Sequence, residues 1–402
     1  MRILHVLPSI NAVTGGPAKS IPLQLKALAG LGHHVELYTT NWPAIEASES
    51  ERVLEQDGVI VHVFAATQIW PLTHVPYSRR LIAAVHLARS SFDVYHASSL
   101  WNPLITHTLA LFRRYRLPYV ITCHGMLDPL VFARHRLAKR WWGQAFERAN
   151  VEGAELVQFT SDQEMHKALR CGWRLRRTLV LPISVDTAAG MDLPQRKRLE
   201  ADYPQLYGKE LIVFVGRVNW VKNLDLLVSA LARVRECGRD VLLLCVGPDS
   251  DGHRAQLERQ AVGLGVGEQV IFTGLLEGEA LKAVFARADI VALVSRKENF
   301  GLAAAEALAA GVPIVLSDGV DMGKEWETPP VWRVAQNPET IAQGLIAALA
   351  YSRDVGVPCA AARALAKREW GDSAVNRLAE LYEVILAARH ATSRSGCPGG
   401  IR

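Results

Sequence analysis

One stretch of the sequence decides the fold, because in it a continuous apolar run passes directly into a polar loop. It reads Leu211-Ile212-Val213-Phe214-Val215-Gly216-Arg217-Val218-Asn219-Trp220-Val221-Lys222-Asn223. Its apolar half predicts a strand buried on both faces, as in parallel sheets. Arg217 and Lys222 follow at the carboxyl end of that strand, the edge where open parallel sheets bind ligands. Two cations there suit a diphosphate, although on spacing alone a solvated basic pair is the simpler alternative.

Further short apolar runs alternate with helical stretches on both sides of this strand. They are residues 3–7, 34–40, 59–64, 92–96, 119–122 and 156–160 before it, and 241–246, 270–273, 290–294 and 313–316 after it. The polar segment 187–210 separates the two sets and indicates a domain boundary. We therefore predict an α/β fold with two Rossmann-like, doubly wound domains, 1–186 and 187–371, that face a central cleft.

The end of the chain predicts one helix and a tail. A helix over 372–390 would place Val375, Leu378, Leu381, Tyr382 and Ile385 on one face. Residues 391–402 contain Gly, Ser, Pro and Arg without periodicity, so we expect a disordered tail there.

Composition limits the class of protein. Half of the 402 residues are hydrophobic and 21% are charged, which excludes a mainly disordered, collagen-like or coiled-coil chain. The six cysteines form no CxxC pair, which favours a reduced, cytoplasmic protein. No apolar run approaches the roughly 18 residues of a membrane span, so we expect a soluble or peripheral protein on the cytoplasmic side.

Three other segments place polar residues at the same edges. Gly15-Gly16 lie between the first strand and the first helix, where backbone N–H groups can approach a phosphate; a tight turn without a ligand is the alternative. Glu298 follows a strand, and Glu306 lies eight residues further on in a helix, so both could accept hydrogen bonds from sugar hydroxyls or be solvated. His124 also follows a strand, although a lone His is more often structural.

Together these segments resemble the retaining glycosyltransferases of family 4, which have the GT-B fold. The resemblance runs from residue 1 to about 390 and rests on F-V-G-R-V-N-W-V-K-N at 214–223, S-R-K-E-N-F-G-L-A-A-A-E at 295–306, Gly15-Gly16 and His124-Gly125. The T-x-H-G-M-L-D-P form at 122–129 is similar to bacterial members that build exopolysaccharide, capsule or O-antigen chains. The chain departs from the family at 182–186, where P-N-G-V-D is common, and at Val320–Trp326, which stands in place of G-G-x-P-E.

The resemblance implies roles for these residues. Arg217 and Lys222 would hold the donor diphosphate, Glu298 the sugar hydroxyls and Glu306 the ribose, while His124 would lie near the reacting sugar. The expected catalytic residues are therefore His124, Arg217, Lys222 and Glu298. Further donor contacts are expected at Gly15, Gly16, Thr273, Gly274, Leu275, Asn299, Phe300, Gly301 and Leu302.

The resemblance also assigns the domains. The first would bind the acceptor and the second the donor, and the helix 372–390 would pack back on the first domain. No metal or other cofactor is expected. Asp249-Ser250-Asp251 looks like a metal-binding DxD, but it matches a connecting loop of the family.

A basic and aromatic stretch suggests a membrane surface. Residues 113–148 hold eight basic and two acidic side chains. We interpret part of this stretch as a helix that docks on an anionic bilayer, where a polyprenyl-diphosphate-linked acceptor would be found; an interior helix with Trp in the core is the alternative. The residues concerned are Arg134, Arg136, Lys139, Arg140, Trp141 and Trp142. Nucleic acid is not expected, because no recognition motif accompanies the charge.

The sequence thus predicts a retaining, metal-independent hexosyltransferase. It would transfer a hexose from a UDP- or GDP-hexose to a hydroxyl of a lipid-linked saccharide, in the synthesis of a bacterial exopolysaccharide, capsule or O-antigen. A nucleotide-sugar epimerase on the same fold and a non-catalytic nucleotide-sugar-binding subunit are the alternatives. The donor sugar, base, acceptor, linkage and oligomeric state stay open.

Overall fold

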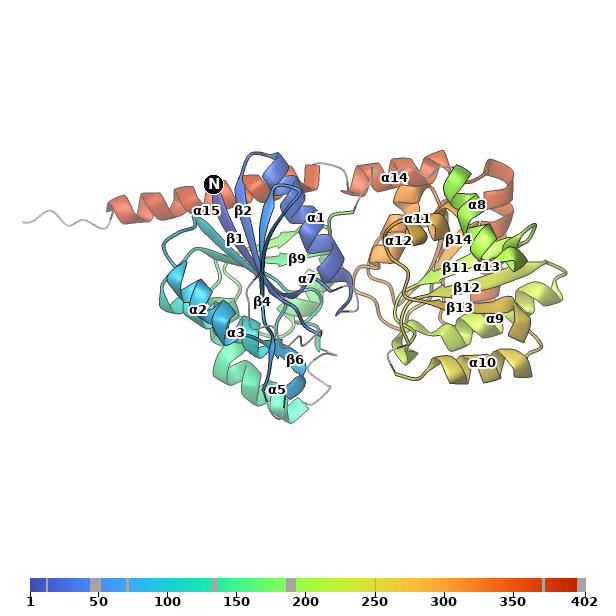
Figure 1. Ribbon diagram of the computed structural model, residues 1–402, viewed down its shortest axis with the longest axis horizontal. Coiled ribbons are helices and arrows are strands. Elements are labelled where there is room, and N and C mark those ends of the chain that lie inside the picture. Colours follow the sequence, from blue (N-terminus) through green and yellow to red (C-terminus); the bar gives the residue numbers. More distant parts are fainter. Residues whose placement is uncertain are drawn as a thin grey trace, which may run out of the picture. The chain divides into compact units, whose positions relative to one another are not determined.

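The chain divides into two compact units (Figure 1). A computed structural model describes residues 1–11, 14–43, 52–69, 72–129, 131, 136–185, 193–249, 251–370 and 373–395. Unit 1 comprises Met1–Ser184 with Asp372–Arg402, and unit 2 comprises Val185–Gly371. The first division falls between 184 and 185, close to the predicted boundary between 186 and 187.

Unit 1 is built on an eight-stranded sheet in the order β10-β9-β8-β7-β1-β2-β4-β3. These strands are β1 (Arg2–Ser9), β2 (His34–Thr40), β3 (Arg52–Gln56), β4 (Val59–Phe64), β7 (Val94–Ser98), β8 (Tyr119–Thr122), β9 (Leu156–Phe159) and β10 (Thr178–Val180). A separate antiparallel hairpin joins β5 (Thr67–Ile69) to β6 (Leu72–Tyr77).

The expectation of a parallel sheet is wrong at one edge of unit 1. β3 pairs with β4 in the antiparallel sense, whereas all other neighbouring pairs of the large sheet are parallel. Asp57 and Gly58 connect the two strands with φ values of 54° and 77°. Two consecutive positive φ angles are typical of a two-residue hairpin turn, and Asp-Gly is a strong sequence signal for it.

Helices cover both faces of this sheet. They are α1 (Gly16–Gly30), α2 (Arg79–Leu87), α3 (Pro103–Arg114), α5 (Arg136–Trp142), the π-helical η2 (Gly143–Glu147), α6 (Arg148–Glu152), α7 (Asp162–Leu169) and α15 (Ser373–Ser395). Ile3 of β1 belongs to a buried cluster with residues of α1 and α15. Its neighbour Leu4 belongs to a second cluster with residues of α2 and α3, as the alternation of side chains along a strand requires.

The C-terminal helix is longer than predicted. α15 continues to Ser395, five residues beyond the expected end at 390. Residues 391–395 contain neither Gly nor Pro, and the first such residue is Gly396, so the sequence holds no helix breaker before that point. The rest of the expected tail, residues 396–402, lies outside the described residues.

Unit 2 contains a fully parallel six-stranded sheet in the order β13-β12-β11-β14-β15-β16. Its strands are β11 (Glu210–Val215), β12 (Val241–Val246), β13 (Val270–Gly274), β14 (Ile290–Leu293), β15 (Ile314–Ser317) and β16 (Val331–Val334). α8 (Leu193–Asp202), α11 (Gly278–Arg287), α12 (Leu302–Ala310) and α14 (Ala360–Trp370) pack on one face, and α9 (Leu224–Glu236), α10 (Arg254–Gly263) and α13 (Pro338–Val355) on the other (Figure 1). The described residues of the unit also form the short 3₁₀ turns η3 (Pro204–Leu206), η4 (Trp220–Lys222) and η5 (Gly267–Gln269).

In each sheet the order in which the strands are added reverses beside the first strand. β1 lies between β2 and β7, and β11 lies between β12 and β14. The loops that leave the carboxyl ends of such a strand pair run to opposite faces, which opens a ligand site at this point. The fold therefore directs attention to the carboxyl ends of β1 and β7 in unit 1, and of β11 and β14 in unit 2.

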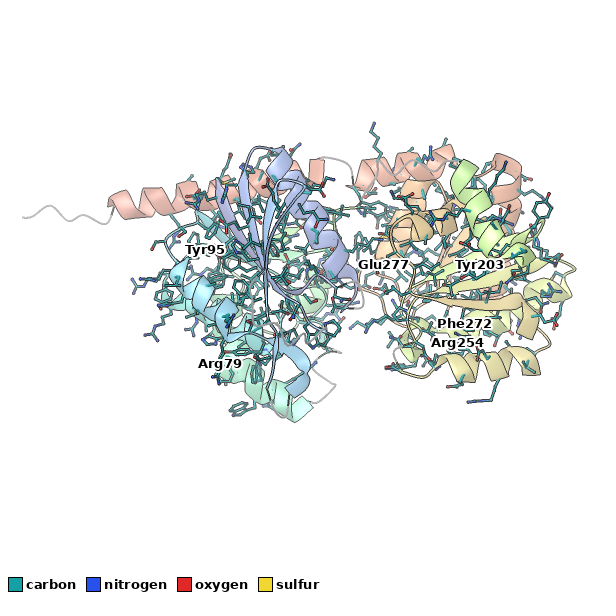
Figure 2. All side chains as sticks on the ribbon, viewed as in Figure 1. Arg79, Tyr95, Tyr203, Arg254, Phe272 and Glu277 are labelled. Carbon is teal, nitrogen blue, oxygen red and sulfur yellow. The ribbon has the colours of Figure 1, made fainter. Side chains whose placement is uncertain are left out.

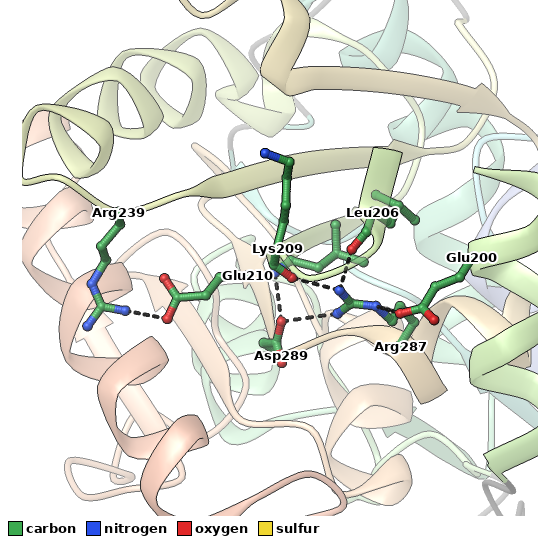
Figure 3. A network of polar contacts seen from close by, with 8 residues as sticks. Glu200, Leu206, Lys209, Glu210, Arg239, Arg287 and Asp289 are labelled. Atoms are coloured by element: carbon green, nitrogen blue, oxygen red, sulfur yellow. Dashed lines mark hydrogen bonds and ion pairs between the residues drawn. The ribbon is translucent and has the colours of Figure 1, made fainter. Parts of the chain in front are cut away.

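A buried ionic network occupies the opposite, amino-terminal edge of the unit 2 sheet (Figure 3). Arg287, whose side chain is 2% exposed, pairs with Glu200 at 2.6 Å and with Asp289 at 3.2 Å. It also donates to the carbonyl oxygens of Leu206 and Lys209. The network ties α8 and η3 to the sheet, and the charge of Arg287 is compensated on several sides.

In the part of the chain that the structure describes, no single helix is both long and apolar enough to span a membrane. The bent helix pair 338–355 and 360–389 meets this requirement only when its two members are counted together.

Candidate functional site

The loop after β11 is shaped by close backbone contacts. Gly247 has a φ of 142°, and a Cβ there would overlap the Gly216 carbonyl oxygen. Asn223 has a φ of 52°, is buried, and donates through Nδ2 to the Val294 carbonyl at 3.1 Å. Glycine at 247 thus allows the loops after β11 and β12 to meet, and Asn223 fastens the first of them to the segment after β14.

Lys222 and Glu298 form an ion pair between Nζ and Oε2. Lys222 belongs to η4 after β11, and Glu298 to the loop after β14, so the pair lies where the strand order reverses. The side chains keep 16% and 22% of their surface exposed. Sequence reasoning proposed both residues separately, and the sheet order brings them together.

Arg217 is exposed at the same edge and has no hydrogen bond or ion pair to the described residues. Nearby, the Arg296 guanidinium lies 5.8 Å from the ring centroid of Trp220, which is also exposed. The Arg296 N–H donates to the Val221 carbonyl at 2.8 Å. Sequence reasoning missed Trp220 and Arg296, although an aromatic side chain in a polar loop is a signal that could have found the first.

The segment from Asn299 to Leu302 leads into α12. Gly301 has a φ of 89°, and a Cβ there would lie 2.9 Å from a methyl group of Leu293, so the close approach to β14 favours glycine. Phe300 is buried against Trp370, with ring centroids 5.9 Å apart. Asn299 and Leu302 are half-buried, and the start of α12 is an electropositive position suited to an anion. Glu306, about one turn into α12, is also half-buried.

The segment predicted to line a base lies at the end of β13. The Thr273 hydroxyl donates to the Gly274 carbonyl at 2.9 Å, Gly274 has a φ of 75°, and Leu275 is exposed. Just before it, the Arg254 guanidinium lies 5.2 Å from the Phe272 ring centroid (Figure 2). β12 separates β13 from β11, so these residues share the carboxyl edge with Lys222 but follow a strand two places away in the sheet.

In unit 1 the glycine pair lies at the start of α1. Gly15, with a φ of 108°, precedes the helix, and Gly16 is its first residue. A Cβ at either position would meet open space within the described residues. Backbone conformation therefore favours glycine at 15, whereas no steric contact of this kind explains Gly16.

His124 follows β8 with a left-handed φ of 50°. Both its ring nitrogens are buried and have no hydrogen-bond partner in the described residues. Burial lowers the pKa of His124 to about 4, so its imidazole is uncharged at neutral pH.

Two further buried histidines surround this turn and were missed. His5 on β1 and His96 on β7 have ring centroids 4.4 Å apart. His96 contacts the Tyr382 hydroxyl of α15 at 2.6 Å and the Thr122 hydroxyl at 2.7 Å. Burial, with a smaller contribution from His124, lowers the pKa of His5 to about 3, and burial also lowers that of His96. The sequence signal that could have found these two histidines is a polar residue within an otherwise apolar strand.

Glu164 holds the His124 turn and was also missed. This carboxylate is 2% exposed and accepts hydrogen bonds from the Gly125 N–H and from Thr160 N–H and Oγ1. Ser161 accepts from the Glu164 N–H at 3.2 Å as the N-cap of α7. The Ser161-x-x-Glu164 spacing predicts a capping box, but here the Glu side chain reaches the turn after β8.

The basic helix divides into exposed and packed residues. Arg140 and Trp141 are exposed, Trp141 to 66%. Lys139 instead donates to the Val131 carbonyl at 2.8 Å, and Trp142 donates through Nε1 to Glu147 at 3.3 Å, so these two predicted surface residues contact the protein. Arg136 is the first residue of α5, and Arg134 lies outside the described residues.

The described residues contain no group of three or more His, Cys, Asp or Glu side chains that could hold a metal ion. Asp249 of the apparent DxD accepts a hydrogen bond from the His253 N–H at 2.9 Å, which stabilises the turn before α10. Ser250 lies outside the described residues.

Comparisons with known proteins agree with this division into units. Residues 15–184, within unit 1, match the family described as "Glycosyl transferase 4-like domain", and residues 195–354, within unit 2, match "Glycosyl transferases group 1". The HepE protein of Anabaena, solved with UDP and glucose, has the same fold: the TM-score is 0.71 at 19% identity, over 95% of this chain and 99% of that one.

Curated relatives match over different lengths. The D-inositol 3-phosphate glycosyltransferase of Xylanimonas cellulosilytica is 32% identical over 352 residues, which cover 78% of this chain and 79% of the relative. An uncharacterised glycosyltransferase of Methanocaldococcus jannaschii is 34% identical over 139 residues, 34% of this chain and only 35% of that relative. By its two family matches, its relatives and its paired parallel-sheet units, this chain belongs to the group 1 glycosyltransferases and has the GT-B fold.

Proposed function

We propose that the chain is a retaining, metal-independent hexosyltransferase that uses a nucleotide-diphosphate hexose. The observation that carries the proposal is the Lys222–Glu298 pair at the strand reversal of unit 2, beside the exposed Arg217. In a UDP- or GDP-hexose, the anionic diphosphate would bind the cations Arg217 and Lys222. The sugar hydroxyls would donate hydrogen bonds to the Glu298 carboxylate. That the similar HepE structure holds UDP supports a nucleotide of this class.

The charges suit the departure of a nucleoside diphosphate. As the bond between the sugar anomeric carbon and the phosphate oxygen breaks, negative charge grows on the diphosphate, where Arg217 and Lys222 would stabilise it. Glu298 would meanwhile hold the sugar through its hydroxyls. Two cations can supply the charge compensation that a metal ion gives elsewhere, which supports metal independence.

A same-face displacement accounts for retention. The acceptor oxygen bonds to the anomeric carbon on the face from which the diphosphate departs, and the acceptor proton passes to the leaving phosphate oxygen. The sugar carries partial positive charge at that moment. A neutral His124 does not repel this charge, and its low pKa keeps it neutral.

We assign the acceptor to unit 1 and propose that it is a lipid-linked saccharide on the cytoplasmic face of the membrane, in bacterial exopolysaccharide, capsule or O-antigen synthesis. The exposed Arg140, Trp141 and Phe146 support this, since Trp141 and Phe146 form an aromatic pair with centroids 5.8 Å apart beside a cation. Arg140→Glu should weaken binding to vesicles containing anionic lipid by severalfold. Arg79→Glu on α2 is the matched control, and equal effects of the two variants would contradict docking through this helix.

A product assay tests the proposed function. The full chain is incubated with UDP-glucose, UDP-galactose or GDP-mannose and a polyprenyl-diphosphate-linked saccharide, with and without EDTA, and the new linkage is analysed by NMR. We expect a product with the donor's anomeric configuration, formed equally with EDTA. An inverted linkage contradicts the retaining route, and loss of activity with EDTA contradicts metal independence. Donor isomerisation without acceptor would indicate the epimerase, and nucleotide binding without turnover a binding subunit.

A further inference from the structure

The loop after β15 is fastened to the backbone of Glu298. Glu298 donates its N–H to the Gly319 carbonyl at 2.8 Å, and Asp321 donates its N–H to the Glu298 carbonyl at 2.8 Å. A Cβ at Gly319 would overlap the carbonyl oxygens of Ser295 and Arg296, so glycine permits this contact. The position of the Glu298 side chain therefore depends on the shape of residues 317–322.

Arg333 holds that loop from the neighbouring strand β16. Its guanidinium donates to the carbonyl oxygens of Ser317 at 3.2 Å and Val320 at 2.8 Å, and also to that of Met322. One guanidinium thus donates hydrogen bonds to three carbonyl oxygens within six consecutive residues. The side chain is half-buried, and burial lowers the pKa of its guanidinium. The nearby carboxylates of Asp318, Glu325 and Asp321 oppose this shift.

The geometry of this contact requires arginine. A planar guanidinium presents five N–H donors in a fixed fork, so its two terminal nitrogens can reach carbonyls that point from different directions. A lysine ammonium offers its donors from a single nitrogen and cannot reproduce this spacing. Without Arg333, the carbonyls of Val320 and Met322 would lose this partner in a partly buried place, whereas the Ser317 carbonyl would keep the Val320 N–H.

We propose that Arg333 is a positioning residue that acts through the 317–322 loop to hold Glu298 in place for the donor sugar. The inference rests on the proposed function, in which Glu298 binds the sugar hydroxyls. The end of this loop, residues 320–322, lies in the region where the sequence departs from the family pattern, Val320–Trp326. Sugar selection by this chain is therefore linked to a residue that does not touch the nucleotide.

The test compares binding of a nucleotide with binding of its sugar conjugate. Isothermal titration measures the affinities of UDP, GDP, UDP-glucose, UDP-galactose and GDP-mannose for the wild type, Arg333→Lys and the control Arg353→Lys, an exposed position on α13. For Arg333→Lys we expect unchanged nucleotide affinity and about tenfold weaker binding of the preferred sugar conjugate, as for the loss of one hydrogen bond to a charged group. Arg353→Lys should leave both affinities unchanged.

A second substitution distinguishes positioning from general damage. In a Glu298→Gln background, Arg333→Lys should add little further loss of sugar-conjugate affinity, because both changes remove the same contact. Nucleotide stoichiometry reports the folded fraction of each variant, so partial unfolding leaves the comparison valid. Unchanged sugar-conjugate affinity, an equal loss of nucleotide affinity, or full additivity with Glu298→Gln would each overturn the inference. A wild type that binds none of the five ligands would instead contradict the proposed function on which it rests.

Discussion

The strands β11 and β14 carry a group of charges at each end, and the two groups differ in how completely they are paired. At the amino ends, Arg287 is almost wholly buried and contacts two carboxylates and two backbone carbonyls (Figure 3). At the carboxyl ends, Lys222 has Glu298 as its ion-pair partner, both remain partly exposed, and Arg217 is open to solvent.

This difference separates stability from binding. A buried charge that has all its partners can contribute to one defined structure, and removing it leaves those partners uncompensated. A partly exposed cation at a strand reversal can exchange its partner for an anionic ligand. The two ends of one strand pair therefore predict opposite results when their charges are removed.

The largest effect is expected at the amino end. Arg287→Met should lower the free energy of unfolding by about 3–5 kcal/mol, because it leaves Glu200 and Asp289 without a buried cation. Urea denaturation measures the loss. Lys282→Met, which removes an exposed pair with Glu279 on the same helix, should cost less than about 1 kcal/mol. Similar unfolding curves for the two variants would contradict the claim that the buried, fully paired Arg287 contributes more to stability than an exposed ion pair.

At the carboxyl end, Lys222→Ala should lower kcat by about 10²–10³-fold, the effect of losing one preorganised electrostatic contact to the leaving group. Its melting temperature should stay near that of the wild type. Lys209→Ala, which removes a pair with Asp240 at the amino edge, is the control and should retain turnover. Turnover close to that of the wild type in Lys222→Ala would exclude this residue from the mechanism.

The buried histidines of unit 1 offer a third contrast, because burial keeps them neutral. Their folded-state pKa values lie below the ordinary value, at about 3 for His5 and about 4 for His124, so the unfolded chain binds more protons between these values and about 6.5. Stability from these groups is therefore present above about pH 6.5 and is lost as the pH falls toward 4. Hydrogen exchange, corrected for intrinsic rates, should show peptides of unit 1 losing protection in this window. Earlier loss in unit 2 would contradict the prediction.

The smallest effect is expected from the support of the His124 turn. In Glu164→Gln, one amide oxygen and an NH₂ group replace two acceptors that serve Gly125 and Thr160, so the turn should shift and kcat should fall about tenfold. UDP affinity should not change, because Glu164 contacts Gly125 and Thr160 and not a residue expected to hold the diphosphate. The ring ¹⁵N signals of His124 should move in the NMR spectrum. Unmoved signals together with unchanged kcat would show that Glu164 only caps α7.

The parts of the fold that depend on local pattern could be predicted from the sequence. Apolar runs place β11, β12 and β14, and the rule for parallel sheets brings Lys222 to the same edge as Glu298, 76 residues away. The antiparallel edge was missed because the Asp57-Gly58 turn signal was not used.

The remaining parts depend on packing that a linear pattern does not encode. Helical spacing predicts Lys139, Trp141 and Trp142 on one surface, yet only Trp141 of these three is exposed. Lys139 lies over the Trp101 ring, and Trp142 donates a hydrogen bond to Glu147 of the π-helical turn. The contact of Arg333 with the 317–322 loop requires the pairing of β15 with β16, and β16 gave too short an apolar run to be predicted.

The central claim is that the cations Arg217 and Lys222, which follow β11, bind the diphosphate of a nucleotide sugar. Isothermal titration of UDP and GDP into the wild type, Lys222→Ala and Arg239→Ala tests it most directly, because Arg239 forms an ion pair with Glu210 at the amino edge (Figure 3). The account predicts one nucleotide bound by the wild type, at least tenfold weaker binding by Lys222→Ala, and unchanged binding by Arg239→Ala. Wild-type protein that binds neither nucleotide, or equal affinities in wild type and Lys222→Ala, would contradict it.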